Sequence, residues 1–265
     1  MYGLYQIVYF TLIDIKRAVC SPFFIAINII IFYQYYQIAM TSNLSKYYAI
    51  KHTISTAILG IMGGFLATII FIYLEVKIIT LDFIYILIFA IILSLKDGRF
   101  MCLSYGGSIL TIISMTFGFP KVNARDVMNV VGVLHLIESI LILFNGRYGK
   151  ISAVVPTVGN IRAGFYINRF WPIPFVIFIG DSLIKPIILM AILNYSDFTF
   201  GGPGLKTVFT SLILLIYSSV IIFLIYLEIN LIIVAIYAIA FHELIIHGNK
   251  GVENIRAKSK EKLVR

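Results

Sequence analysis

Residues 126–174 read DVMNVVGVLHLIESILILFNGRYGKISAVVPTVGNIRAGFYINRFWPIP, and they join an apolar run, a basic connector and a proline-rich return to apolar sequence. The apolar run carries His135 and Glu138 near its middle. Ionisable side chains at membrane depth are costly, so they face protein or water instead of lipid. This stretch therefore predicts a membrane helix with an inward-facing polar side, followed by a segment outside the hydrocarbon.

Composition places the rest of the chain in the same class. Of its 265 residues, 60% are hydrophobic and 12% are charged, and the mean hydropathy is +0.99. A soluble domain carries about twice that charged fraction. Apolar runs of roughly 20 residues recur along the chain, which is the length needed to cross a hydrocarbon core of about 30 Å. We expect an all-α fold, a polytopic integral membrane bundle of about eight transmembrane helices.

The apolar runs define the expected organisation. Residues 1–248 form a helical transmembrane domain, in which 1–17 is an interfacial or re-entrant helix because it is short of a full span. Residues 145–170 are expected to lie along the membrane surface as a basic connector. Gly248 is expected to end the last helix, and residues 249–265 to form a basic cytoplasmic tail. The crossings themselves are expected at 22–40, 53–74, 82–95, 100–117, 126–144, 171–193, 205–225 and 231–247.

The net charge of +9 comes from Lys and Arg residues that lie in the short gaps between apolar runs. This pattern indicates membrane topology and contact with anionic lipid headgroups, not a nucleic-acid partner. The expected partners are the lipid bilayer and other membrane or membrane-associated proteins. A second copy of the chain, in a homo-oligomer, is a further candidate partner. Eight crossings with both ends in the cytoplasm would put the basic connector outside, which conflicts with the excess of positive charge expected on the inner side.

Small residues mark one face of the second span. Thr56, Gly60, Gly64 and Thr68 are four residues apart and therefore share one side of a helix. Small side chains at this spacing let two backbones approach closely. The pattern predicts tight packing against a partner helix of the same chain.

Four ionisable side chains form the expected buried polar network. His135 and Glu138 are three residues apart and can touch on one helix, and Asp181 and Lys185 have the spacing of a helical ion pair. The structural interpretation is that these groups hold the helix at 126–144 against the one at 171–193. The functional alternative is a proton relay or an ion site.

Three further residues are expected at the membrane interface. Trp171 precedes an apolar run and is typical of the aromatic belt, and Arg162 and Arg169 belong to the basic connector before it. The two cysteines, Cys20 and Cys102, are too few and too far apart for a disulfide scaffold or a zinc motif. We expect each to be a small core or lipid-facing residue.

The sequence contains no nucleotide-binding or serine-hydrolase motif. His242, Glu243 and His247 suggest a zinc protease, but histidines must be four residues apart to share a metal on one helix face, and these are five apart. We therefore expect no catalytic residue, no metal site and no cofactor.

Three short motifs resemble a known family. They are Val-x-x-Leu-His-x-x-Glu-Ser from Val131 to Ser139, the run from Asn160 to Pro174 that ends in Phe-Trp-Pro-x-Pro, and His-Glu-Leu-Ile-Ile from His242. Together they resemble the membrane part of the MinJ-like proteins of Firmicutes, in which a cytosolic PDZ domain follows a polytopic membrane domain. The second motif of the family begins Gly-x-x-x-Gly-Phe, and in this chain its first glycine is replaced by Asn160, which Gly159 precedes. The sequence also ends at Arg265, where the PDZ domain of the family would begin.

The resemblance implies a cell-division topology factor without catalytic residues. The resemblance does not imply for this chain the peptide-binding role that the PDZ domain has in that family. The expected function is thus a non-enzymatic scaffold or anchor in the cell membrane that recruits partner proteins. An ion- or proton-coupled transporter and, less favoured, an intramembrane hydrolase are the alternatives.

Overall fold

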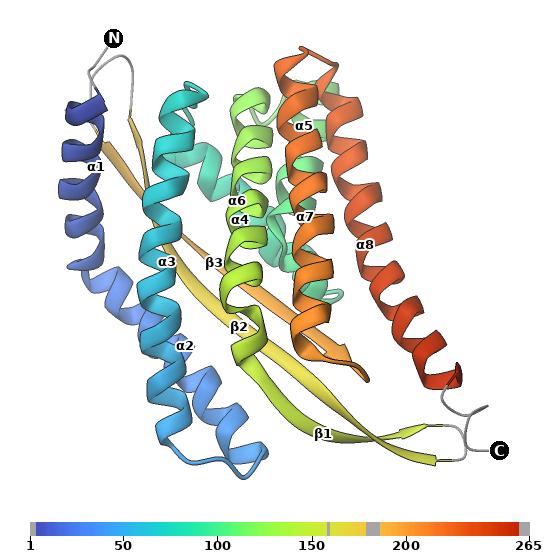
Figure 1. Ribbon diagram of the computed structural model, residues 1–265. Helices are drawn as coiled ribbons and strands as arrows, with labels where there is room; N and C mark the ends of the chain where they lie inside the picture. The colour runs from blue at the N-terminus through green and yellow to red at the C-terminus, as the bar shows by residue number, and fades with distance from the viewer. Residues whose placement is uncertain (1–3, 158–159, 179–185, 260–265) are drawn as a thin grey trace.

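The computed structural model describes residues 4–157, 160–178 and 186–259, which form a helical bundle crossed by a small sheet (Figure 1). The helices are α1 (Leu4–Val19), α2 (Pro22–Thr41), α3 (Tyr47–Tyr73), α4 (Thr80–Ser94), α5 (Leu103–Phe117), α6 (Ala124–Asn145), α7 (Pro203–Tyr226) and α8 (Leu231–Ser259). The short 3-10 helices η1 (Gly98–Met101) and η2 (Gly146–Gly149) precede α5 and follow α6. The strands are β1 (Lys150–Thr157), β2 (Asn160–Phe178) and β3 (Pro186–Thr199).

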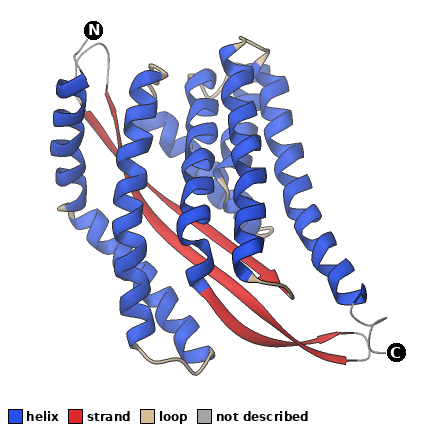
Figure 2. Ribbon diagram, in the orientation of Figure 1, coloured by secondary structure: helices blue, strands red, loops and turns tan. Residues whose placement is uncertain are grey.

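Among the described residues, five helices are long and apolar enough to cross a membrane, namely α2, α3, α6, α7 and α8. Helices α4 and α5 are apolar but have only 15 residues each. The mostly helical character expected of a membrane protein is therefore present, whereas the number of eight crossings is not confirmed. The expectation of an all-α fold is wrong, because a three-stranded sheet lies within the bundle (Figure 2).

Two predicted helix starts are found in the structure with the caps that explain them. The hydroxyl of Ser21 accepts a hydrogen bond from the backbone N–H of Phe24 at 3.2 Å, and Pro22 occupies the first turn of α2. Asn123 caps α6 by accepting from the N–H of Asp126 at 3.3 Å. Side-chain acceptors at this position satisfy backbone donors that have no partner within the helix.

The segments at 145–170 and 171–193 differ most from the sequence-based expectation. The described part of 145–170 forms η2, β1 and the first half of β2, and its expected place at the membrane surface stays a prediction. The described part of 171–193 forms the rest of β2 and the start of β3, so the sixth membrane helix expected there is wrong. Pro186 would lie in the interior of the predicted helix, where a proline removes a backbone donor and clashes with the preceding turn, and in the structure it is the first residue of β3. The sheet is antiparallel, with the strand order β1-β2-β3.

Helix α3 covers one edge of β2. Beyond residue 167, β2 pairs only with β3, so its other edge needs a different partner. At this edge a Cβ built on Gly60 or Gly64 would fall onto the carbonyl oxygens of Pro172 and Pro174. The small residues of α3 therefore serve a close approach as expected, but the partner is a strand and not a helix.

Between Phe170 and Val176, the backbone donors along this edge of β2 are also accounted for. The N–H groups of Phe170 and Val176 donate to the Tyr35 hydroxyl at 3.1 Å and to the Thr68 hydroxyl at 2.9 Å. Between Phe170 and Val176, the alternate residues that face this edge are Pro172 and Pro174, and neither has an N–H. A sheet edge in a lipid-excluded interior must satisfy every donor, and here two side chains and two prolines do so.

Helix α6 lies at the centre of the core. Its buried face packs against α7 and the sheet, where Met128, Leu134, Ile137 and Trp171 are almost fully buried. Helices α2, α7 and α8 expose many large apolar side chains on their outer faces. Such faces suit acyl chains, since apolar surface of this extent is unusual on a water-exposed monomer.

Helix α8 does not end at Gly248 but continues to Ser259, so the predicted stop is wrong. Nothing lies within 4 Å of a Cβ built at this glycine, and the helix passes through it without a cap. The far end of α8 lies beside the β1–β2 hairpin (Figure 1), where Arg162 donates to the carbonyl of Arg256 at 3.5 Å. Residues of the basic connector and of the basic tail therefore meet at one end of the molecule.

Candidate functional site

Three metal-binding side chains from three separate parts of the chain meet inside the bundle. Cys102 lies directly before α5, His135 in the middle of α6 and His242 in α8. The Cys102 Sγ atom lies 3.1 Å from Nε2 of His135 and 3.5 Å from Nε2 of His242. We call these three residues the Cys–His cluster. Its ligand atoms all lie within 4.8 Å of one another.

The opposite nitrogen of each imidazole is held by an oxygen atom. Nδ1 of His135 lies 2.7 Å from the carbonyl oxygen of Val131, one turn earlier in α6. Nδ1 of His242 lies 3.2 Å from the hydroxyl of Tyr105, which donates to a carboxylate oxygen of Glu243 at 2.9 Å. These contacts orient both rings with Nε2 directed at the thiol of Cys102.

The cluster is closed on one side and reaches the surface on the other. His135 is 2% exposed, whereas Cys102 and His242 are only partly buried. Arg99 of η1 pairs with Glu243 at 3.3 Å, and both side chains are about one-third exposed or less. A chain of polar contacts therefore leads from the interior His135 to a surface ion pair.

The predicted network of His135, Glu138, Asp181 and Lys185 lies only partly within the described residues. His135 contacts Cys102 and His242, and the structure shows no hydrogen bond between His135 and Glu138. Asp181 and Lys185 lie outside the described residues. The helical ion pair assumed for them, and its packing against α6, therefore stay predictions.

The protease-like arrangement of His242 and His247 has a different geometry from a zinc protease. His247 is largely exposed, bonds the backbone carbonyl of Glu243 through Nδ1 at 2.9 Å and pairs with the Glu243 carboxylate at 3.2 Å. His242 points instead toward Cys102 and Tyr105. The two histidines of α8 thus face different neighbours, as the five-residue spacing predicts.

The interface anchors expected at Trp171 and Arg169 are wrong, because both side chains are buried in the core at 0% and 1% exposure. The indole N–H of Trp171 donates to the side-chain oxygen of Asn145 at 3.2 Å. The guanidinium of Arg169 donates to the carbonyl of Asn145 at 3.0 Å and to Nδ1 of His52 at 2.6 Å. It thus satisfies a carbonyl at the C-terminal end of α6, where a positive charge is favoured by the helix dipole.

A second buried cation ties α7 to the sheet and to α8. Lys206 is 3% exposed and lies 3.2 Å from a carboxylate oxygen of Asp197 and 3.8 Å from one of Glu253. Glu253 also accepts from the Thr199 hydroxyl at 3.1 Å and from Arg256 at 2.8 Å. Burial raises the pKa of the Asp197 carboxyl, and the nearby ammonium of Lys206 acts in the opposite direction.

The β1–β2 hairpin forms an arm at the end of the molecule where α8 ends (Figure 2). We define the arm as β1 together with residues 160–167 of β2, which pair from Lys150↔Ile167 to Thr157↔Asn160. Pro156 cannot donate to this ladder, so its nitrogen faces the outer edge. By the alternation of a strand, the N–H groups of Lys150, Ser152 and Val154 face outward as well.

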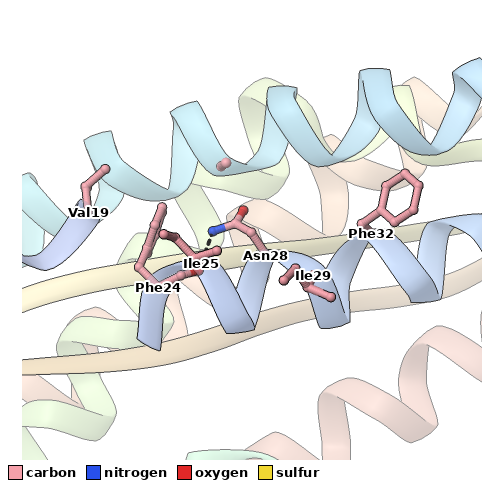
Figure 3. A pocket seen from close by; sticks show the side chains of 7 residues that line it. Val19, Phe24, Ile25, Asn28, Ile29 and Phe32 are labelled. Atoms are coloured by element: carbon pink, nitrogen blue, oxygen red, sulfur yellow. Dashed lines mark hydrogen bonds between the residues drawn. The ribbon is translucent and has the colours of Figure 1, made fainter. Parts of the chain in front are cut away.

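A shallow groove between α2 and α3 is lined almost entirely by apolar side chains (Figure 3). The lining includes Phe24, Ile25, Ile29 and Phe32. Asn28 is the polar member, and its amide nitrogen donates to the carbonyl of Phe24 at 2.8 Å. The groove therefore suits an acyl chain better than a polar ligand.

Sequence reasoning missed Cys102 and the role of His242. Their partners are 33 and 140 residues away along the chain, so no local spacing could reveal the cluster. It also missed Lys206, His52 and the arm. The proline positions 172 and 174 carried a usable signal, because two prolines at an interval of two share one strand edge.

No family model matches the chain, and no curated protein and no solved structure is significantly similar to it. The resemblance to the MinJ-like membrane domain stays a prediction. The fold and composition support the broader class, a mostly helical protein with helices compatible with insertion in a membrane.

Proposed function

We propose that this chain is a non-enzymatic integral membrane anchor that presents the arm to a partner protein at the cytoplasmic face. The observation that carries the proposal is the outer edge of β1, where a row of backbone donors points away from β2. Exposed strand edges bind extended segments of other chains by adding a strand. The helical bundle would hold this edge next to the bilayer.

Charge supports an acidic segment as the partner. Residues 145–165 contain Arg147, Lys150 and Arg162 and no acidic residue. Basic residues close to membrane helices favour the cytoplasmic side, and the adjoining end of α8 adds Arg256. An extended, acidic segment of a cytosolic protein would therefore match both the hydrogen-bonding edge and the charge of the arm.

Crosslinking from the arm tests this proposal. Val154 is 70% exposed, and a photoreactive residue at this position is expected to crosslink in cells to an acidic, extended segment of one cytosolic protein. Ser152→Pro removes one outward N–H and leaves the β2 ladder intact, so we expect it to lower the crosslinked yield about 5- to 10-fold, equivalent to roughly one hydrogen bond. Mass spectrometry of the crosslinked peptide identifies the segment.

The matched control carries the photoreactive residue at Ile216, a 64% exposed position on α7. It is expected to give no crosslink to that protein. The proposal is contradicted if Val154 crosslinks only to lipid, or if Ser152→Pro leaves the yield unchanged while the variant retains wild-type stability.

A proton-coupled transporter is the second candidate, because polar contacts connect His135 to the partly exposed Glu243. This alternative requires substrate-dependent proton flux in liposomes that is lost in both His135→Ala and Glu138→Ala. Under the anchor proposal we expect the same background flux in the wild type and in both variants. Fluorescence of a pH dye trapped inside the liposomes measures the difference.

A further inference from the structure

The Cys–His cluster contains a hydrogen-bonding deficit. A backbone carbonyl only accepts hydrogen bonds, so Nδ1 of His135 carries the proton that binds the carbonyl of Val131. The hydroxyl of Tyr105 donates to the Glu243 carboxylate, so its oxygen accepts from Nδ1 of His242. Both neutral imidazoles therefore present an unprotonated Nε2 to Cys102.

One thiol cannot satisfy two such acceptors. The Sγ atom of Cys102 carries a single proton, yet Nε2 of each histidine lies within 3.5 Å of it. One Nε2 lone pair is therefore left without a donor among these three residues. Protonating an imidazole would supply the missing hydrogen but would bury a positive charge, which is expensive in a low-dielectric interior.

A metal ion removes this deficit. We propose that Cys102 Sγ, His135 Nε2 and His242 Nε2 bind a Zn²⁺ ion at the junction of α5, α6 and α8. This inference goes beyond the anchor function and does not depend on it. On binding, the thiol proton leaves to solvent and a sulfur–zinc bond forms, while each imidazole contributes its Nε2 lone pair without losing a proton.

The observed spacing fits this ion. Bond lengths of about 2.3 Å to sulfur and about 2.0–2.1 Å to nitrogen at a tetrahedral angle place the two donor atoms about 3.6 Å apart. The two sulfur–nitrogen distances in the structure are 3.1 and 3.5 Å, each within about half an ångström of this value. The three donor atoms lie within 4.8 Å of one another, so the two imidazoles must draw together when the ion binds. A thiolate with two imidazoles is a donor set that suits zinc or copper, whereas magnesium and calcium prefer oxygen.

The surroundings of the cluster have the features of a metal centre. Ligating histidines almost always donate their second N–H to a carbonyl or another oxygen group, which orients the ring. Val131 and Tyr105 provide these acceptors here, and Glu243 holds Tyr105 in turn. The ring of Tyr217 packs edge-on against His135 with centroids 5.5 Å apart and shields the inner side.

Charge favours a divalent ion over a monovalent one. Glu138 lies one turn beyond His135 on α6 and interacts electrostatically with Cys102. A thiolate and a carboxylate together balance the two positive charges of Zn²⁺, and a buried site with no net charge costs less than an unbalanced one. Once the ion is bound, Glu138 would supply the second negative charge.

Metal analysis of the full-length protein tests the site. After purification in detergent, dialysis against a chelator and reloading with ZnCl₂, we expect about one tightly held zinc per chain, as for a zinc site with three protein ligands. Cys102→Ser, His135→Ala and His242→Ala are each expected to lose this zinc. Cys20→Ser and His247→Ala are matched controls and should retain it, since both residues lie outside the cluster.

Two measurements keep the test independent of folding defects. Zinc is expected to protect Cys102 of the wild-type protein from maleimide, while the exposed Cys20 is labelled with or without the metal. Tyr105→Phe removes an acceptor and not a ligand, so its zinc dissociation constant should rise about 10- to 100-fold. Equal labelling of Cys102 with and without zinc would overturn the proposal, and so would zinc that Cys102→Ser retains, because the metal would then be adventitious.

Discussion

Gly64→Ala is expected to destabilise the protein more than the same change at any other glycine of α3. The added Cβ would occupy the position of the Pro174 carbonyl oxygen, which belongs to the backbone of β2 and cannot rotate away. Helix α3 and the strand must therefore separate, which breaks the hydrogen bond from the Val176 N–H to Thr68 of α3. We expect a loss of about 3 kcal/mol or more, at the upper end of overpacking effects, and a fall in the unfolding midpoint of about 6–12 °C.

Thermal unfolding in detergent, followed by size-exclusion chromatography or intrinsic fluorescence, measures this effect. Gly248→Ala is the matched control, because it makes the same change within a helix at a position with nothing within 4 Å. Since alanine favours a helix over glycine, the control should be neutral or stabilising by up to about 1 kcal/mol. Equal midpoints for the two variants would show that α3 does not approach β2 this closely.

Thr68→Val examines the same edge by a gentler change. Valine has nearly the shape of threonine but cannot accept the hydrogen bond from the N–H of Val176. A buried donor without a partner costs about 1–3 kcal/mol. A variant that folds and shows this intermediate loss would assign the effect to the strand edge and not to a general defect of α3.

Arg169→Leu is expected to have the second large effect. The guanidinium is almost fully buried and donates to the carbonyl of Asn145 and to Nδ1 of His52. Leucine leaves both acceptors without a donor, at about 1–3 kcal/mol each, or about 2–6 kcal/mol together. Arg169→Lys should not restore stability, because an ammonium on a flexible stem does not reproduce the planar fork of arginine.

A double-mutant cycle with His52→Leu tests the cause. If the lost contact accounts for the effect, the double variant should be more stable than the sum of the single losses predicts, by about 0.5–3 kcal/mol. Arg147→Ala is the control, because Arg147 is exposed and should change stability by less than about 0.5 kcal/mol. Strict additivity of the two single variants would contradict the assignment.

Hydropathy predicted the apolar segments well but not their conformation. The segments of α2, α3, α6 and α7 were located from length and composition. The segment at 171–193 satisfied the same criterion and yet contains strands, because an apolar run alone does not distinguish a helix from a buried strand. Pro186, in the interior of the predicted helix, was the local signal against it.

The close packing of the small-residue face of α3 was predicted correctly, but its partner was not. Its four-residue spacing required a close neighbour, but spacing on one helix contains no information about the partner. Only the fold shows that the neighbour is β2, whose prolines and carbonyls fit the glycines. The buried positions of Trp171 and Arg169 depend on the same arrangement, since the strand carries both side chains into the core and not to the membrane surface.

The sequence by itself determined that the chain is apolar enough to enter a membrane, and where most of its helices begin. These properties follow from local composition and periodicity, which a single segment expresses without its neighbours. The tertiary structure alone decided which groups pair. Cys102, His135 and His242 lie far apart in the sequence, and only the packing of α5, α6 and α8 brings their donor atoms together.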